Sequence, residues 1–259
     1  MTTYRRIRQT VTNAQAQTKG RLKFYCAWYC PFAQRAWMAQ LHKELDFEYI
    51  EVDPYRESTW WLRISRKRAK VPVIASPTGN ANGPTTVIDS TRILEYLEDL
   101  VSDRNLLYPG DANARAELRF WGDHINERIV PYVYRFLEAH DPGEYRDDSR
   151  KALLEGLEEL ADAMSPEGPY FSGSALTAID IMLMPFAYRI DALLGHYRDF
   201  SLPTAGETWS RYRRWYENMR NTPIFQGTLS DPENYRQRLI EHYLPYSQGK
   251  GQQDVTDIP

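Results

Sequence analysis

The sequence predicts a small α/β domain followed by an all-α domain. In the first hundred residues, short apolar or alternating runs interleave with stretches of helical period, which indicates strands and helices packed in layers. Residues 101–111 contain Pro and Gly at the point where such a domain would end. Beyond residue 111 the apolar residues recur at helical spacing almost throughout, and no strand signal is strong.

Each element of the first domain has its own local signal. Pro31 suits the first position of a helix, and Ser90 is expected to cap the last helix of the domain. Residues 76–84 (SPTGNANGP) predict a hairpin loop, so the strands beside it would pair antiparallel, whereas a helical crossover makes the first two strands parallel. We expect strands at 21–28, 47–53, 71–75 and 85–89, and helices at 31–45, 54–70 (short and irregular) and 91–100.

The second half is expected to be helical, with its first helix kinked at Pro131 because proline cannot donate the helical hydrogen bond. The expected helices are 112–140, 146–164, 177–195, 208–220 and 234–243. The domain organisation that follows is an N-terminal extension (1–20), an α/β domain (21–100), a linker (101–111), a helical domain (112–245) and a disordered tail (246–259).

Composition and charge narrow the classes of function. The chain has 259 residues, is 42% hydrophobic, and carries a net charge of −3 that favours neither nucleic acid nor an anionic membrane as a partner. No run approaches the roughly 20 apolar residues of a membrane span, and the polar first twenty residues are unlike a secretory signal. Arg5, Arg6 and Arg8 leave an organelle presequence as the lesser alternative. Two cysteines rule out a disulfide scaffold and fit a reducing compartment, so we expect the cytoplasm.

The strongest chemical signal is Cys30, which follows the first predicted strand and opens the first predicted helix. Unpaired backbone N–H groups and the helix dipole stabilise a thiolate there, which lowers the cysteine pKa from about 8.5 toward neutrality. Arg35 adds a positive charge about one turn away. A buried, inert cysteine is the alternative. Cys26 lies within the strand and is expected to pack, so a mechanism with one thiol is favoured.

Two further pairs of residues stand at the ends of predicted elements. Val71-Pro72 opens a strand, where proline is disfavoured, and a cis bond before Pro72 would leave the Val71 backbone able to pair with a peptide ligand. Asp89 and Ser90 stand at a strand-to-helix junction. Besides capping, the hydroxyl and N–H groups there can hold a carboxylate and Asp89 can hold an ammonium group, which together suit an α-amino acid head.

Thr177 and Asp180 form a capping box before the apolar run IMLMPFA. Their role is structural, since they start a buried helix. Pro185 lies inside that run and implies a kink or local repair by packing.

Together these motifs resemble those of soluble glutathione transferases, and most closely of the omega class. The matching motifs are C-P-F-A-Q-R (30–35), Val71-Pro72, Asp89-Ser90 and Thr177-x-x-Asp180, and the resemblance covers roughly residues 20–245. It implies a thioredoxin-like N-terminal domain, an all-α C-terminal domain, glutathione as co-substrate without a metal, and a homodimer.

The resemblance also implies roles for individual residues. Cys30 would form a mixed disulfide with glutathione beside the Phe32 backbone. Val71 would pair with the cysteinyl backbone of glutathione, along an edge shaped by Pro72. The remaining binding residues implied are Asp89 and Ser90 for the γ-glutamyl group and, for the glycyl carboxylate, Arg56 or Lys70.

Lys70 is an alternative to Arg56 because the segment before Val71 departs from the common Asn-Pro-x-Gly pattern and reads RKRAK (66–70). The stretch 63–70 contains five basic residues in eight. It is interpreted either as a solvated face or as a region that attracts anionic glutathione, with nuclear targeting as a weaker alternative.

The second substrate is expected between the domains, in an aromatic-walled cleft. For each candidate, a place in the core or on the surface is the alternative. The candidates are Trp121, His124, Tyr132, Tyr188 and Arg189, of which Arg189 matches an omega-class position.

Three functions are compatible with these motifs. The first is an omega-type thiol transferase and reductase, with thiol-disulfide exchange, dehydroascorbate reduction and deglutathionylation through Cys30. The second is glutathione conjugation, ether cleavage or tailoring of a specialised metabolite. The third is a non-catalytic binding module, because chloride intracellular channel proteins share the C-P-F motif. Insertion into a membrane is disfavoured because charged residues interrupt the first-helix region.

Overall fold

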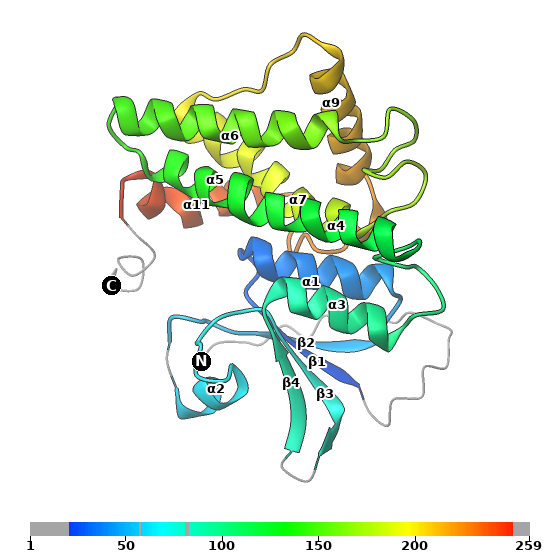
Figure 1. Cartoon of the computed structure of the whole chain (residues 1–259). Coiled ribbons are helices and arrows are strands. Elements are labelled where there is room, and N and C mark those ends of the chain that lie inside the picture. Colours follow the sequence, from blue (N-terminus) through cyan, green and yellow to red (C-terminus); the bar gives the residue numbers. More distant parts are fainter. Residues whose placement is uncertain (1–20, 57, 81–82, 251–259) are drawn as a thin grey trace. The chain divides into compact units, whose positions relative to one another are not determined.

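The computed structural model describes residues 21–56, 58–80 and 83–250, which divide into two compact units (Figure 1). The first unit ends at Leu107 and the second begins at Tyr108, so the division falls within the segment predicted as a linker. The predicted N-terminal extension (1–20) lies outside the described residues. A small mixed-sheet unit followed by a helical unit confirms the predicted fold class.

A four-stranded mixed sheet in the order β2-β1-β3-β4 forms the first unit. Its strands are β1 (Leu22–Cys26), β2 (Phe47–Glu51), β3 (Val73–Asn80) and β4 (Gly83–Ile88). β1 and β2 are parallel, with Leu22 opposite Phe47, whereas β3 runs antiparallel to both β1 and β4. The predicted strand directions are therefore confirmed.

The β3–β4 hairpin is longer than predicted. β3 continues through Ser76 to Asn80, where the sequence predicted a loop from residue 76 onward. The register between β3 and β4 shifts between Ser76 and Asn80, and Pro77 lies in this irregular part. Proline is tolerated at such a place because a bulge or an edge does not need its missing N–H group. Residues 81–82 lie outside the described part of the chain.

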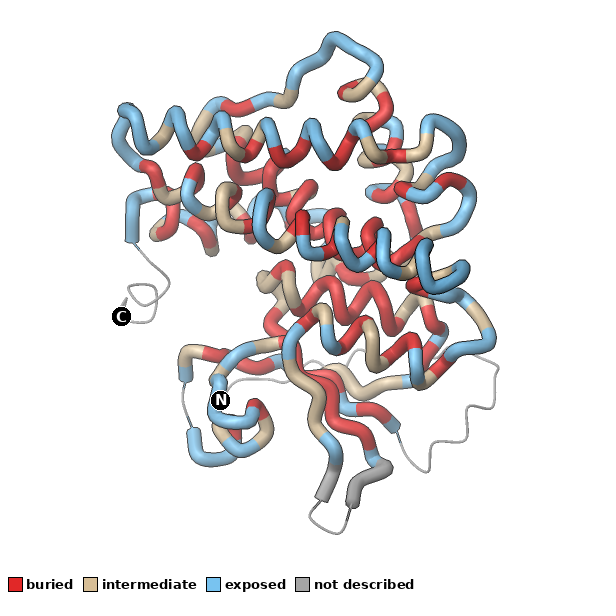
Figure 2. The backbone as a smooth tube through the Cα atoms, viewed as in Figure 1, coloured by how far each residue is buried: buried red, intermediate tan, exposed pale blue. Residues whose placement is uncertain are grey.

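One face of the sheet is covered by α1 (Pro31–His42) and α3 (Ser90–Leu100) (Figure 1). α1 is buried along most of its length (Figure 2). The Phe24 ring of β1 packs edge-on against Trp37 of α1, with 6.3 Å between the ring centroids. Because alternate strand residues share a face, Cys26 lies on the same side as Phe24, beneath the helix that Cys30 begins.

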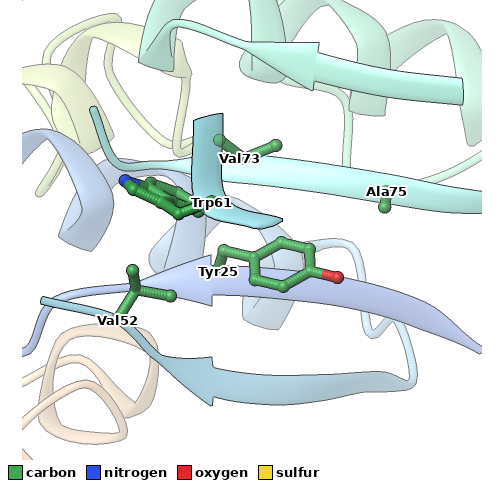
Figure 3. Packing of buried hydrophobic residues seen from close by; sticks show 5 residues of the cluster. All are labelled: Tyr25, Val52, Trp61, Val73 and Ala75. Atoms are coloured by element: carbon green, nitrogen blue, oxygen red, sulfur yellow. The ribbon is translucent and has the colours of Figure 1, made fainter. Parts of the chain in front are cut away.

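The opposite face of the sheet carries α2 (Thr59–Ile64), which is shorter than the predicted 54–70 segment. Figure 3 shows its Trp61 side chain against the sheet, together with Tyr25 of β1 and Val73 of β3. Trp61 is 1% exposed, so this short helix is fixed to the sheet by its one buried aromatic side chain. The loop 65–70 follows α2 directly, so its first residue is held in place by the packing of α2 on the sheet.

A buried ion pair joins α1 to α3. Nζ of Lys43 donates to Oε2 of Glu98 at 2.5 Å and to the Val101 carbonyl at 2.7 Å. The same carboxylate oxygen of Glu98 accepts the Leu107 N–H at 2.8 Å. Val101 and Leu107 belong to the predicted linker. Their hydrogen bonds to the Lys43–Glu98 pair fix this part of the linker to the first unit.

The second unit is helical, as predicted. Its helices are α4 (Ala112–His124), α5 (Val130–Glu138), α6 (Glu144–Asp162), α7 (Ala178–Arg189), α8 (Gly195–Arg198), α9 (Glu207–Arg220), α10 (Pro223–Gln226) and α11 (Tyr235–Ser247), with π-helical turns η1 (Ile125–Ile129) and η2 (Ile190–Leu194). In α6 the buried residues Leu153, Leu157 and Leu160 recur at helical spacing, and buried and exposed residues alternate along it in Figure 2. Among the described residues, no helix is both long and apolar enough to cross a membrane.

The predicted helix 112–140 is divided: the π-helical turn η1 separates α4 from α5, and Pro131, where a kink was predicted, is the second residue of α5. The short helix α10 has no counterpart among the predicted elements. α11 extends to Ser247, so it enters the segment predicted to be a disordered tail. The buried Tyr246 ring packs 5.2 Å from Tyr243, and the burial of this aromatic side chain explains why the helix continues.

The capping box of Thr177 and Asp180 is present at the start of α7. One Asp180 oxygen accepts the backbone N–H and the hydroxyl of Thr177, and the other accepts Nε1 of Trp215 at 2.8 Å. Burial raises the pKa of Asp180, and the hydrogen bonds from Phe171, Thr177 and Trp215 oppose that rise. The carboxylate thus starts the buried helix α7, as predicted, and it also links the start of α7 to Trp215 of α9.

Candidate functional site

Cys30 is the N-cap residue of α1, with extended backbone angles and Pro31 as the first helical residue. Its N–H donates to the Ala27 carbonyl at 2.9 Å, and its carbonyl accepts the Gln34 N–H at 3.0 Å. Its side chain is half-buried, and Sγ lies 4.0 Å from the Val71 carbonyl oxygen. The predicted place of this cysteine, between the end of a strand and the start of a helix, is therefore confirmed.

Cys26 contrasts with Cys30, although both are thiols and neither is part of a disulfide. Cys26 is only 1% exposed, and burial raises the pKa of its thiol well above the usual value. A hydrogen bond with Tyr49 lowers that pKa in part, and the charge of Glu51 raises it further. Cys26 is therefore a protonated, inaccessible thiol, and Cys30 is the cysteine that a solute can reach.

Glu51, at the end of β2, holds the loop that leads to Cys30. Its Oε1 accepts the Trp28 N–H at 3.0 Å, and its Oε2 accepts the hydroxyl hydrogen bond of Tyr49. Glu51 is not among the site residues predicted from sequence. The only available signal was an acidic residue at the end of a strand predicted to lie parallel to the first.

A cavity of about 640 Å³ lies in the first unit. Six of the residues predicted to bind glutathione line it: Phe32, Lys70, Val71, Pro72, Asp89 and Ser90. The other lining residues are Lys67, Arg68 and Ile88. Arg56 is exposed and is not among them. Cys30 does not line the cavity itself, but its thiol lies beside the carbonyl of Val71, which does.

The Val71-Pro72 peptide bond is cis, as predicted. These two residues precede β3, so they lie outside its ladder, and the missing N–H of Pro72 is not needed there. Val71 is half-buried and Pro72 is buried. They bring the start of β3 to the wall of the cavity, within 4.0 Å of the Cys30 thiol.

The start of α3 differs from the prediction, because Asp89 and not Ser90 caps the helix. Oδ1 of Asp89 accepts the Thr91 and Arg92 N–H groups at 3.0 and 3.1 Å. A carboxylate can accept both N–H groups and also interacts favourably with the positive end of the helix dipole. This explains why Asp89 caps the helix in place of Ser90. Ser90 is the buried first residue of α3, and its Oγ accepts a hydrogen bond from Nη1 of Arg35 at 3.4 Å.

Ser65 fixes the loop that follows α2. It is fully buried, its Oγ donates to the Trp61 carbonyl at 2.8 Å, and the same oxygen accepts the Ala69 N–H at 3.1 Å. The Lys67 N–H donates to the Leu62 carbonyl at 2.6 Å. The loop therefore has a defined conformation, although its side chains are mostly exposed.

That loop supplies three cations to the cavity, from Lys67, Arg68 and Lys70. Arg66, Lys67 and Ala69 have positive φ angles of 52°, 62° and 50°, in the left-handed region that residues with a Cβ seldom adopt. The basic stretch is evident in the sequence, but the place of Lys67 and Arg68 at the site was not predicted from it. Their placement depends on these unusual backbone angles, which no local pattern indicated.

Two candidates for the second-substrate cleft are buried in the second unit and bound to protein groups. His124 is 8% exposed, with Nε2 at 2.8 Å from the Gly156 carbonyl. Arg189 is 1% exposed, and its Nη1 donates to the Pro185 carbonyl at 2.8 Å. Desolvation lowers the pKa of Arg189, but the neighbouring side chains of Tyr235, Tyr243 and Tyr134 together raise that pKa by more. The core alternative fits both residues.

Trp121 and Tyr188 are half-buried. Nε1 of Trp121 donates to Glu117 at 2.8 Å, and its ring packs against Phe171. Tyr188 packs against Phe225, with 5.3 Å between the ring centroids. Their assignment to a second-substrate cleft stays a prediction.

Comparison with protein families gives two matches along the chain. The model for "Glutathione S-transferase, N-terminal domain" matches residues 29–100, and the model for "Glutathione S-transferase, C-terminal domain" matches residues 143–218. The first match contains the predicted thiol, the Val71-Pro72 step and the Asp89-Ser90 pair. The second contains the capping box.

Individual relatives agree with these matches. "Probable glutathione S-transferase DHAR2, chloroplastic" from Oryza sativa subsp. japonica is 25% identical over 79% of this chain and 67% of its own length. "Glutathione S-transferase U28" from Arabidopsis thaliana is 29% identical over 83% and 91%.

Solved structures share the fold. Glutathione transferase Omega 3C from Trametes versicolor is 29% identical, with a TM-score of 0.72 over 88% of this chain and 90% of that chain. Rice GST1, solved in complex with glutathione, is 26% identical, with a TM-score of 0.71 over 85% and 94%.

Proposed function

The chain belongs to the glutathione S-transferase superfamily, and from this premise we propose that it is an omega-type thiol transferase that carries glutathione as a mixed disulfide on Cys30. The observation that carries the proposal is the contrast between its two cysteines. Cys30 is half-buried, starts α1 and lies 4.0 Å from the Val71 carbonyl at the cavity, whereas Cys26 is sealed within the sheet.

The first chemical step is attack by the Cys30 thiolate on a disulfide that contains glutathione. The bond between Cys30 and the glutathionyl sulfur forms as the old S–S bond breaks, and the other sulfur leaves as a thiolate. A second glutathione thiolate then attacks the mixed disulfide, which yields oxidised glutathione and restores the Cys30 thiolate. Dehydroascorbate reduction fits the same balance, because two glutathione molecules supply two electrons and become one glutathione disulfide.

The cavity supports a binding arrangement for glutathione. Asp89 and Ser90 would hold the γ-glutamyl ammonium and carboxylate at the start of α3. The backbone of Val71 would pair with the cysteinyl residue, which brings its sulfur toward Cys30. For the glycyl carboxylate, Lys70 is favoured over Arg56, because Lys70 lines the cavity and Arg56 does not.

The test is incubation with oxidised glutathione, followed by intact-mass and peptide mass measurement. We expect one glutathionyl group on Cys30, no adduct in Cys30→Ser, and the same single adduct in the matched control Cys26→Ser. Turnover of a small glutathione mixed disulfide should disappear in Cys30→Ser and persist in Cys26→Ser. A Cys30→Ser variant with full thiol-transferase turnover would refute the proposal.

Conjugation of glutathione to an electrophile, or a related lyase or tailoring reaction, is the second candidate. It is favoured by relatives whose names state only a glutathione S-transferase, such as U28 and U19 of Arabidopsis thaliana. Turnover of 1-chloro-2,4-dinitrobenzene that survives in Cys30→Ala, in a protein without disulfide reductase activity, would favour this candidate. Failure to bind glutathione in calorimetry would favour a non-catalytic module.

We also propose that the protein is a homodimer in the cytoplasm. The assembly is inferred from the superfamily, and the compartment from the low cysteine content, with neither Cys26 nor Cys30 in a disulfide. Relatives named as cytosolic and as chloroplastic both occur, so the compartment needs its own test. Light scattering would measure the mass in solution, and a C-terminal fluorescent fusion would show the compartment.

A further inference from the structure

The cavity carries more positive charge than one glutathione needs. Three cationic side chains line it, from Lys67, Arg68 and Lys70, against the single carboxylate of Asp89. The inference below rests on the proposed function, because it takes this cavity as the glutathione site.

The three cations are available to a ligand. Within the described ranges of the chain, the side chains of Lys67, Arg68 and Lys70 make no ion pair or hydrogen bond with any protein group, and all three are exposed. The carboxylate of Asp89 is already engaged with the Thr91 and Arg92 N–H groups of α3. The cavity wall therefore offers anions a surplus of unneutralised charge.

The loop that holds these cations is built rather than loose. The buried Ser65 hydroxyl binds both ends of the turn, from the Trp61 carbonyl to the Ala69 N–H. Arg66, Lys67 and Ala69 are kept in the left-handed region although none of them is glycine. Such unfavourable backbone angles persist only where the surrounding structure imposes them, and they cluster at ligand sites.

The charges of glutathione do not account for all three cations. Its γ-glutamyl end carries an ammonium and a carboxylate, for which Asp89 and Ser90 suffice. Its other end carries one carboxylate. We propose that this loop selects glutathione-type ligands that carry at least one further carboxylate, either on the C-terminal residue or on the group attached to sulfur.

The experiment measures dissociation constants by calorimetry for two matched pairs of ligands. The first pair, γ-Glu-Cys-Glu and glutathione, tests an added carboxylate at the C-terminal residue. The second pair, S-carboxymethylglutathione and S-methylglutathione, tests one on the sulfur substituent. We expect the acidic member of at least one pair to bind about fivefold more tightly, since an exposed charge pair contributes about that much. The ratio of the two dissociation constants within that pair should move toward one in high salt, because salt screens exposed charges.

The variant Lys67→Gln/Arg68→Gln should bring that ratio to within about twofold of one. Arg63→Gln is the matched control, because Arg63 is an exposed cation of the same basic stretch that does not line the cavity. It should leave the ratio unchanged. Arg68→Gln alone keeps the test decisive if the double variant does not fold, and it should lower the ratio in part.

A ratio near one for both pairs in the wild-type protein would overturn the inference, as would a preference that survives the double variant or that Arg63→Gln abolishes equally. In each case glutathione binding and the Cys30 adduct would still stand, so the proposed function would be unaffected. Loss of glutathione binding altogether would instead remove the proposed function, and the inference with it.

Discussion

His42, the last residue of α1, should make the stability of the protein depend on pH in a predictable direction. The pKa of its imidazole is lowered from 6.5 to about 4. Burial is the main cause; the charge of Lys43 also lowers this pKa, and the charge of Glu98 opposes the shift by a smaller amount. Nε2 of His42 is buried and has no hydrogen-bond partner among the residues that the structure describes. The folded protein therefore holds this ring neutral, whereas the unfolded chain protonates it below about pH 6.5.

The sign and the size follow from linkage. Because the pKa is lowered on folding, the unfolded state binds more protons, and the contribution of His42 is fully present above pH 6.5 and lost as the pH falls toward 4. A difference between 6.5 and about 4 corresponds to about 3 kcal/mol at the acid limit, of which about 2 kcal/mol is lost by pH 5.

The assay is urea unfolding at pH 7.5, 6, 5 and 4.5 for the wild-type protein and His42→Gln, followed by tryptophan fluorescence. Other carboxyl groups titrate in both proteins, so the readout is the difference in unfolding free energy between them at each pH. We expect that difference to move in favour of His42→Gln by about 2 kcal/mol between pH 7.5 and pH 5. A difference that stays constant with pH would refute the reasoning.

Three further outcomes are expected. Iodoacetamide at pH 8 should label Cys30 in the folded protein and reach Cys26 only after unfolding, because Cys26 is buried with a raised pKa; equal labelling rates in peptide mass maps would contradict this. Asp89→Ala should cost about 1 kcal/mol of thermal stability through the lost cap and also weaken glutathione binding in calorimetry, whereas a cap without a ligand role would lose stability alone. Lys43→Met should destabilise by about 3 kcal/mol in denaturant titration because it removes the ammonium that neutralises the buried Glu98 carboxylate, and adding Glu98→Gln should recover part of the loss.

Much of the first unit follows from local rules. The Cys-Pro step predicts the start of α1, because the N–H group that proline lacks is not needed at the first position of a helix. The strand directions follow from the length of each connection. The capping box locates the start of α7 to the residue. These features depend on neighbours within a few positions, which the sequence displays directly.

Other features depend on neighbours far along the chain, and the sequence did not reveal them. Glu51 is placed beside Trp28 by the parallel register of β1 and β2, and no local pattern marks it. Lys67 and Arg68 face the cavity because a buried Ser65 holds the loop in left-handed angles. Arg189 is 1% exposed because the helices of the second unit pack around it, and no local pattern decided between the core and the cleft for this residue.

The residues of the site share a structural position, which explains why some of them could be predicted from sequence and others could not. Cys30 caps α1, Asp89 caps α3, and Val71 precedes β3, so each stands at the start of a helix or a strand. Capping and proline rules identify such starts from sequence. Selectivity among ligands instead depends on side chains that tertiary packing turns toward the cavity, such as Lys67 and Arg68. The shared chemistry of a superfamily should therefore be readable from element starts, while the preference of one member among anionic ligands lies in a loop such as 65–70.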